Sequence, residues 1–465
     1  MHRRLLCLVF SAVALFFLAT TYHLAGEKLT RLAGPSFSHP KANAPVPSPS
    51  PKENPTETSD AKHTVESSEP ESKKEKPAEN TEKPAKQVEI LSKKDLDTYL
   101  DVIFDRKNSE SKLEDLRLAC RPINETRYKE LKEWKHAVDR RPWYFALNLY
   151  QVQELLPQLM GSIVRAARYL GTENSALSIV EGNSKDATVQ ILEAMREGLK
   201  AENMQYYFES SDLSPNAEGA DRIDILAELR NMALKPLLQD HKHFSANSTA
   251  VFINDVAICP NDILELMWQR IKLGAVQTCA MDWNYHDGKH PVFYDVWVTR
   301  TMQGDSFFHI PKDGSWDDAW HMFPNDTVTG KRFSEWRPFQ VYSCWNGATA
   351  FSALPLMEGV RFRKFAGNEC VQGEPQLFGK DLWLRGYGRI AVVPTINLDY
   401  KIENARRIKK DRGYTEDLIN DKDPNDDLIE WQTTPPEKTL CQVGWHNQFW
   451  QSWNLDYENK TASDW

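Results

Sequence analysis

The chain has 465 residues, a formal net charge of −9 and 41% hydrophobic residues. This length accommodates more than one ordinary domain. The sequence contains no basic stripe and no alternation of basic with aromatic residues, which argues against a nucleic-acid partner. From about Gln87 onward large apolar and aromatic residues become frequent, so this part of the chain can form a sizeable core.

The N-terminal segment has the pattern of a membrane anchor. Residues 1–4 include two arginines, and an apolar run follows that is just long enough to span a bilayer. We predict a cytosolic tail over 1–4 and an uncleaved transmembrane signal anchor over 5–24, with a cleaved signal peptide as the alternative. Residues 25–88 are rich in Pro, Ser, Glu, Lys and Thr, which predicts a disordered stem. Residues 89–465 then form a lumenal domain.

Two further features fit the secretory pathway. Of seven cysteines, six follow the predicted anchor. They are compatible with up to three disulfides, and no CxxC pair supports a zinc site. Sequons predict N-glycosylation at Asn124, Asn247, Asn325 and Asn459. We therefore expect a single-pass type II protein of the Golgi or another secretory membrane.

Predicted strands alternate with predicted helices in the first half of the lumenal domain. The strands are expected at 144–150, 176–180, 204–209 and 251–253, and the helices at 156–170, 187–199 and 222–238. This alternation predicts a parallel, Rossmann-like sheet. Later strands are expected at 275–281, 341–344 and 390–393, with strand-like sequence over 350–363. Motifs of dinucleotide sites, P-loops, serine hydrolases and zincins do not occur.

The strand predicted at 251–253 organises this pattern. It runs directly into Asn254 and Asp255, and Pro260 then begins a helix. Open α/β sheets bind ligands at the C-terminal ends of their strands. A cation that carries a diphosphate takes only one or two oxygens from protein. Asp255 is therefore a candidate metal ligand, with a simple turn cap as the alternative.

Acids follow other predicted strands as well. They are Glu181, Asp186, Asp282 and the group of Glu369, Glu374 and Asp381. Carboxylates that converge at one sheet edge are costly unless a cation or sugar hydroxyls satisfy them. This convergence favours a metal or substrate role for Asp255 over a turn cap. For Asp282 and Asp295, simple surface caps remain an equal alternative.

Other residue types are weaker candidates. Arg230 and Arg300 have the charge to neutralise a diphosphate, or form ordinary salt bridges. Trp297 and Trp345 have the rings to stack on sugars, although core packing is the commoner role of Trp. His446 is a candidate second metal ligand, against the usual structural role of a lone histidine.

Seven short motifs resemble the fungal capsule-associated α-1,3-mannosyltransferases, glycosyltransferase family 69. They lie between about residues 140 and 400, at 146–150, 179–184, 252–256, 279–283, 293–297, 343–347 and 380–383. The resemblance implies an α/β fold with a GT-A-like, Rossmann-type mixed sheet flanked by helices. It implies GDP-mannose as donor, a divalent cation (Mn²⁺ or Mg²⁺), and transfer to the 3-hydroxyl of an α-mannoside with retention. Membrane attachment and association with other glycan-synthesis enzymes are also expected.

Residue chemistry and the resemblance together assign roles to the candidates. The predicted catalytic residues are Glu374 and Asp381, and the predicted metal ligands are Asp255 and His446. The predicted donor-binding residues are Glu181, Asp186, Arg230, Asn254, Asp282 and Arg300. The predicted acceptor-binding residues are Asp295, Trp297, Trp345 and Asn346. The pair Asn254-Asp255 replaces the usual Asp-x-Asp motif, so a single carboxylate holds the cation. Two cysteines that relatives are expected to carry near Glu374 and Lys380 are missing here.

Three alternative functions stay open on sequence alone. One is a lumenal glycoside hydrolase, which needs a closely spaced carboxylate pair and which no hydrolase motif supports. The donor can differ, with UDP-xylose as an example. The chain can be a catalytically silent glycan-binding or scaffold protein, which the missing second acid beside Asp255 motivates. In an active enzyme, an acid can stabilise or attack the anomeric carbon, or the leaving phosphate can itself deprotonate the acceptor.

Overall fold

The computed structural model describes residues 90–106, 115–134, 142–419 and 428–455. The predicted anchor over 5–24, the stem over 25–88 and the sequon at Asn459 lie outside the described residues. Contacts divide the chain into two units, Met1–Thr81 and Glu82–Trp465. All described residues belong to the second unit. Within these ranges no helix has both the length and the apolar character needed to cross a membrane.

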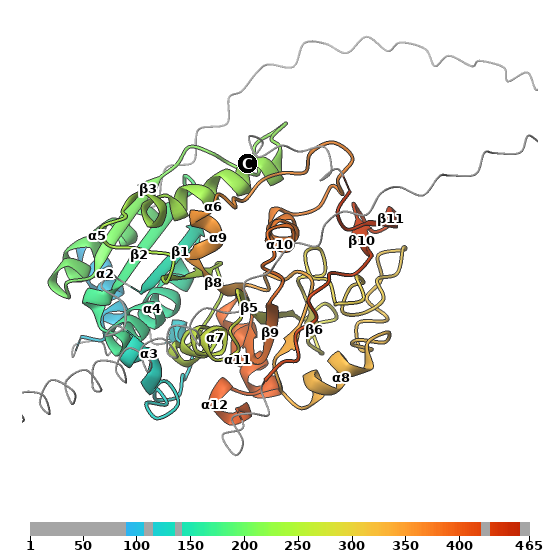
Figure 1. The fold of residues 1–465 in the computed structure, drawn as a ribbon. Helices are drawn as coiled ribbons and strands as arrows, with labels where there is room; N and C mark the ends of the chain where they lie inside the picture. Colours follow the sequence, from blue (N-terminus) through green and yellow to red (C-terminus); the bar gives the residue numbers. More distant parts are fainter. Residues whose placement is uncertain (1–89, 107–114, 135–141, 420–427, 456–465) are drawn as a thin grey trace, which may run out of the picture. The chain divides into compact units, whose positions relative to one another are not determined.

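A mixed sheet of nine strands is the centre of the second unit (Figure 1). The strand order is β3-β2-β1-β4-β8-β5-β9-β7, and β6 pairs with β5. The strands are β1 Trp143–Leu149, β2 Ser175–Glu181, β3 Gln205–Ser210, β4 Thr249–Ile253, β5 Gln277–Asn284, β6 Val292–Phe293, β7 Phe339–Gln340, β8 Ala348–Ser352 and β9 Ile390–Leu398. Strands β3, β2, β1 and β4 are parallel, as the alternating pattern predicts. Strand β8 runs against both β4 and β5.

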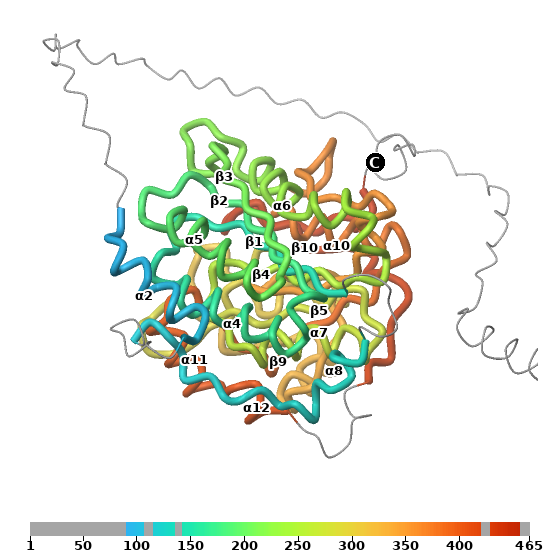
Figure 2. The backbone as a smooth tube through the Cα atoms, turned by 90° about the vertical axis from the view of Figure 1, so that its left-hand side faces the viewer, coloured from blue at the N-terminus to red at the C-terminus, as the bar shows by residue number. Residues whose placement is uncertain are grey.

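Helices cover both faces of the sheet. They are α2 Lys93–Ile103, α3 Lys129–Trp134, α4 Leu156–Leu170, α5 Thr188–Ala201, α6 Arg222–Gln239, α7 Pro260–Lys272, α8 Thr327–Ser334, α9 Ala353–Met357, α10 Glu374–Leu384, α11 Ile402–Arg412 and α12 Thr415–Leu418. Side chains of β1 alternate between two cores. Phe145 and Leu147 pack in the core with α4, α5 and α7, whereas Tyr144 and Ala146 pack in the core with α6. Figure 2 shows α2 outside α4 on the first face.

Most predicted elements occur close to their expected positions, with two corrections. Residues 341–344 form no strand, and only an isolated bridge joins Ser343 to Arg300. Residues 350–363 are strand only as far as Ser352, whose side chain accepts a hydrogen bond from the Leu354 amide and caps α9. A local cap therefore ends the strand where the apolar sequence continues.

Disulfides tie distant parts of the unit together. All six cysteines after the predicted anchor are paired, as Cys120–Cys259, Cys279–Cys344 and Cys370–Cys441. The last bridge fixes a short hairpin, β10 Lys438–Gln442 and β11 Gln448–Ser452, to the segment that precedes α10. Of the sequon asparagines, Asn247 and Asn325 are exposed and Asn124 is half-buried.

Candidate functional site

The C-terminal ends of several strands meet at one edge of the sheet. Strands β1, β2, β4, β5 and β9 all run in the same direction. Their ends bring Asn254, Asp255, Asp282 and Tyr400 to this edge. Strand β8 enters the sheet from the same edge, and the Asn254 amide donates to the Gly347 carbonyl at 2.9 Å. The carboxyl edge of the sheet is the usual ligand site of α/β proteins.

Buried acids at this edge influence one another. The Tyr400 hydroxyl donates to Asp282 Oδ2 at 2.7 Å. Burial and the neighbouring Asp295 raise the pKa of Asp282 well above its ordinary value. Burial also raises the pKa of Asp295, to about 6. Asp255 is half-buried, and burial raises its pKa while the positive charge of Arg230 opposes that shift. At this edge, the protein by itself therefore does not fully offset the cost of burying the carboxylate charges.

Arg230 on α6 links the strand end to α10. Its Nε donates to Glu374 Oε1 at 2.7 Å, and its Nη1 lies 3.4 Å from Asn254 Oδ1. The guanidinium carbon lies 4.3 Å from the centre of the Trp345 ring. Trp345 Nε1 donates to the same Asn254 oxygen at 3.0 Å. Four of the predicted site residues thus form one connected cluster.

Asn346 connects this cluster to Asp295. Its amide donates to Asp295 Oδ2 at 2.8 Å, and its side-chain amide donates to the Ala280 carbonyl at 2.8 Å. Asn346 has φ of 59° and Gly347 has φ of 80°, a left-handed pair that Asn and Gly tolerate. A Cβ on Gly347 would lie 3.1 Å from Val256 Cγ1. The tight turn before β8 therefore depends on this Asn-Gly pair.

A pocket of about 810 Å³ opens beside Asp255. Its wall includes Asp186 after β2, Tyr400 after β9, and the cationic side chains of Lys401 and Arg406. The remaining lining residues are Asp115, Leu116, Gln151, Val152, Gln153, Glu154, Leu155, Ile402 and Glu403. The pocket thus holds five carboxylates, of Asp115, Glu154, Asp186, Asp255 and Glu403, and the two cations of Lys401 and Arg406. It offers acceptors for hydroxyl groups or a cation, and positive charge for a phosphate.

The structure gives Glu181 and Arg300 internal partners. Glu181 is buried and accepts from the amides of Asn183 and Ser184 and from the Ser210 hydroxyl. Arg300 is buried too, and its guanidinium donates to the main-chain carbonyls of Leu440, Val296 and Thr299. Through these hydrogen bonds, both side chains stabilise loops next to the carboxyl edge of the sheet.

Asp381, Glu369 and Glu374 do not follow a strand, contrary to the sequence interpretation. Asp381 and Glu374 lie on α10, which Pro375 helps to begin after Gly373. Both carboxylate oxygens of Asp381 accept from Arg363, at 2.7 Å each. Glu369 pairs with Arg363 and with Lys380. Only Glu374 joins the cluster around Arg230.

His446 lies exposed in the turn between β10 and β11. Across the described ranges, no group of three or more His, Cys, Asp or Glu side chains is arranged to hold a metal ion. A cation at Asp255 would therefore take most of its ligands from substrate and water.

Sequence reasoning missed Asp399, Tyr400, Lys401 and Arg406. The strand expected at 390–393 stops before Pro394, because proline disfavours a central strand. In the structure β9 continues to Leu398, with an irregularity in its pairing to β5. The acid and tyrosine that follow the true strand end could have been found by extending the apolar run past Pro394.

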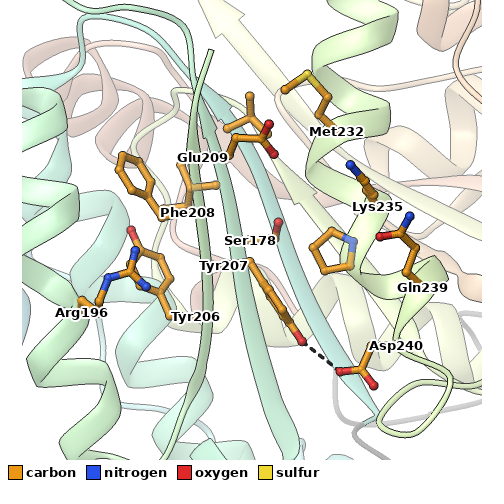
Figure 3. A pocket seen from close by; sticks show the side chains of 13 residues that line it. Ser178, Arg196, Tyr206, Tyr207, Phe208, Glu209, Met232, Lys235, Gln239 and Asp240 are labelled. Carbon is orange, nitrogen blue, oxygen red and sulfur yellow. Dashed lines mark hydrogen bonds between the residues drawn. The ribbon is translucent and has the colours of Figure 1, made fainter.

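A second pocket, of about 630 Å³, lies at the other side of the sheet (Figure 3). It is lined by residues of β2, β3 and the C-terminal part of α6, with Arg196 from α5. Tyr207 donates to Asp240 there at 3.2 Å. Arg196 and Tyr206 lie on the opposite face of β3 from Tyr207. None of the acids at the strand-end edge lines this pocket, so the candidate site is the pocket beside Asp255.

The titration of Asp295 predicts a pH effect on stability. Its pKa is about 6 in the folded state, against about 3.9 when unfolded. The folded state therefore retains this proton to a higher pH than the unfolded state does. As a result, the free energy of unfolding falls as pH rises from about 4 to 6. Asp295→Asn should stabilise the protein at pH 7 by about 1–3 kcal/mol and have little effect below pH 4, as measured by urea denaturation.

Asp313→Asn provides the matched control for that measurement. Asp313 is an exposed carboxylate whose pKa is lowered by hydrogen bonds from Ser315. Its ionised form is favoured in the folded state, so its replacement should lower stability at pH 7 rather than raise it. An Asp295→Asn effect of equal size at pH 4 and pH 7 would contradict the assignment.

The mixed α/β sheet, its edge of acids and the adjoining pocket define the class. Together these features are typical of enzymes whose substrates carry phosphate and many hydroxyl groups. Glycosyltransferases belong to this class. A family model described as Cryptococcal mannosyltransferase 1 matches residues 142–381. The chain belongs to this family, which confirms the fungal capsule-associated family indicated by the sequence motifs.

A characterised relative supports the same membership. Alpha-1,3-mannosyltransferase CMT1 of Cryptococcus neoformans is 34% identical over 355 residues, covering 73% of this chain and 75% of the relative.

Two solved structures share weaker similarity. TarS (residues 1–349) of S. aureus is 14% identical with a TM-score of 0.33, covering 56% of this chain and 60% of that one. The mannosyltransferase PcManGT of Pyrobaculum calidifontis, solved with GDP-Man and Mn²⁺, is 11% identical with a TM-score of 0.33, covering 59% and 63%. This chain thus spans less than two thirds of either structure. TM-scores this low do not support conclusions about the fold or function of this chain.

Proposed function

We propose that the chain is an α-1,3-mannosyltransferase with a GT-A-like fold, which transfers mannose from GDP-mannose to the 3-hydroxyl of an α-mannoside with retention. One observation carries this proposal. The stretch that matches the mannosyltransferase family, residues 142–381, contains Asp255, Asp282, Asp295 and Glu374, and these acids lie at or beside one edge of the sheet. The name of the relative supports the linkage and the sugar.

The pocket beside Asp255 is the proposed donor site. Lys401 and Arg406 provide positive charge for the diphosphate, and Asp186 provides an acceptor for ribose hydroxyls. Asp255 would hold a divalent cation, Mn²⁺ or Mg²⁺, whose remaining ligands come from the diphosphate and water. The residues fit such a cation, because Asp282 Oδ1 is buried without a hydrogen-bond partner in the described part of the chain. When bound, the cation stabilises charge on the leaving diphosphate.

Glu374 is the proposed acid near the anomeric carbon. Its ion pair with Arg230 holds the carboxylate in one place at the start of α10. From there it either stabilises the oxocarbenium-like carbon or attacks it, unless the leaving phosphate alone serves as base. Asp381, which is fully engaged by Arg363, positions α10. Asp295, Asn346 and Trp345 position the acceptor side, with Trp297 as a surface for sugar.

Location in the Golgi or another secretory membrane is part of the proposal. The three disulfides support it, because such bonds persist in oxidising compartments. The exposed sequons at Asn247 and Asn325 are accessible to glycosylation.

The test is a donor panel with the purified full-length protein and α-mannobiose as acceptor. We expect transfer from GDP-mannose, loss of transfer with a chelator, recovery with Mn²⁺, and an α-1,3 linkage identified by NMR. Transfer from UDP-xylose alone would contradict the donor assignment. A β-linked product would contradict retention.

A further inference from the structure

We propose that an aromatic ridge beside the acids binds the sugar chain of the acceptor beyond the mannose that is elongated. The ridge consists of Trp297, Trp445, Trp316 and His286. This inference rests on the proposed function and deepens it. It makes the preferred acceptor an oligosaccharide or polysaccharide rather than a mono- or disaccharide.

The rings of the ridge follow one another at contact distance. The ring centres of Trp297 and Trp445 are 5.0 Å apart, and those of Trp445 and Trp316 are 5.8 Å apart. His286 stacks on Trp316 at 5.3 Å. Trp297 is 36% exposed, and His286 is also exposed. Trp445 and Trp316 are half-buried and pack against the apolar core, so the exposed parts of the ridge are its two ends. Exposed aromatic side chains grouped in this way mark a candidate binding surface.

The main chain that carries two of the rings is held by hydrogen bonds. The Trp297 carbonyl accepts from Gln372 Nε2 at 3.1 Å. Gln448 Nε2 donates to the Trp445 carbonyl at 2.8 Å and to the Ile310 carbonyl at 3.1 Å. A Cβ on Gly314 would lie only 3.4 Å from Trp445 Cγ, so the indole lies close against the backbone there. A surface fixed in this way loses little conformational freedom when it binds a ligand.

One end of the ridge lies on the segment that carries Asp295 of the candidate site. Trp297 follows Asp295 by two residues, and Asp295 accepts from the Asn346 amide. Tyr294 is 42% exposed, and its ring packs edge-on against Tyr400 at 5.3 Å. Tyr400 in turn contacts Asp282 and lines the pocket beside Asp255. Exposed Tyr294 and exposed Trp297 thus flank Asp295 in the sequence, which places one end of the ridge on the same segment as the acids.

The chemistry of the ridge suits a glycan. Indole rings present broad apolar faces to the C–H faces of sugars, while their N–H groups and nearby polar side chains meet the hydroxyls. Asp313 and His446 lie close enough to interact electrostatically beside Trp445, which adds polar groups at the rim. In Figure 1 the β10–β11 hairpin lies beside the loops that follow β6. The ridge is thus assembled from chain segments far apart in sequence.

Trp316→Ala tests the inference, with Trp450→Ala as the matched control. Trp450 lies on the same hairpin as Trp445 and is 51% exposed, but it is not part of the ridge. With a mannooligosaccharide of about six residues, Trp316→Ala should raise KM about tenfold, the loss of one stacking contact. Its kcat and its KM for α-mannobiose should stay unchanged. Trp316→Phe should restore most of the affinity, and Trp450→Ala should behave like the wild type.

Direct binding separates this inference from the proposed function. Long mannooligosaccharides should quench tryptophan fluorescence in the wild type and in Asp255→Ala, and less so in Trp316→Ala. Equal KM for short and long acceptors in the wild type would overturn the ridge and leave the transferase intact. Absence of any transfer from GDP-mannose, with quenching retained, would overturn only the proposed function. Loss of a copurifying protein in Trp316→Ala, with kinetics unchanged, would make the ridge a protein interface instead.

Discussion

Asp255→Asn is expected to lower kcat for mannose transfer by about three orders of magnitude, because a bound cation contributes several kcal/mol to charge stabilisation. The substitution keeps the size of the side chain and removes only its charge. Burial raises the pKa of Asp255, so the ionised carboxylate is unfavourable in the protein without a ligand. The variant should therefore be at least as stable as the wild type.

The measurement combines steady-state kinetics with thermal unfolding and a Mn²⁺ titration of donor binding. The variant should bind GDP-mannose weakly, and added Mn²⁺ should no longer improve its binding. His446→Ala is the informative companion, because the exposed turn that holds His446 predicts little change in Mn²⁺ dependence. An Asp255→Asn enzyme with normal kcat would rule out a cation at the end of β4.

Arg230→Met should destabilise the protein by about 3–5 kcal/mol, the usual cost of leaving one member of a buried ion pair without its partner. The side chains of Arg230 and Glu374 are only 9% and 3% exposed. Loss of Arg230 also removes contacts to Asn254 and Trp345, so transfer should fall even at temperatures where the variant is folded. Urea denaturation and kcat at low temperature report the two effects separately.

The double variant Arg230→Met/Glu374→Gln tests the cause of that loss. Because it removes both charges, it should recover much of the stability but none of the activity. Lys364→Met is the matched control, since Lys364 pairs with Asp221 and Asp224 at the surface and its side chain is 45% exposed. Such an exposed, solvent-screened pair contributes little to stability. Equal losses for Arg230→Met and Lys364→Met would contradict a buried, stabilising pair.

The sequence predicts those parts of the fold that depend on local pattern. The apolar run that ends at Asn254 and Asp255, followed by Pro260, correctly indicates the end of β4 and the start of α7. Prediction from sequence fails where contacts between residues far apart in the chain determine the structure. Arg230 and Glu374 are 144 positions apart, and no spacing rule reveals their contact. Nor does sequence distinguish Glu374, which faces the cluster, from Asp381, which Arg363 engages. Pro394 suggests that β9 ends before it, whereas the strand continues to Leu398.

The antiparallel strand β8 has a consequence for how this enzyme can change over time. The β3-β2-β1-β4 half of the sheet is formed by one continuous stretch, 143–253, whereas the ridge is formed by loops further along the chain. Because β8 separates β4 from β5 in the sheet, insertions in these loops do not alter the pairing of the first four strands. Such insertions would therefore leave the strands that precede Asp186 and Asp255 in place, whereas Lys401 and Arg406, the cations of the proposed donor site, follow β9 in the other half of the sheet.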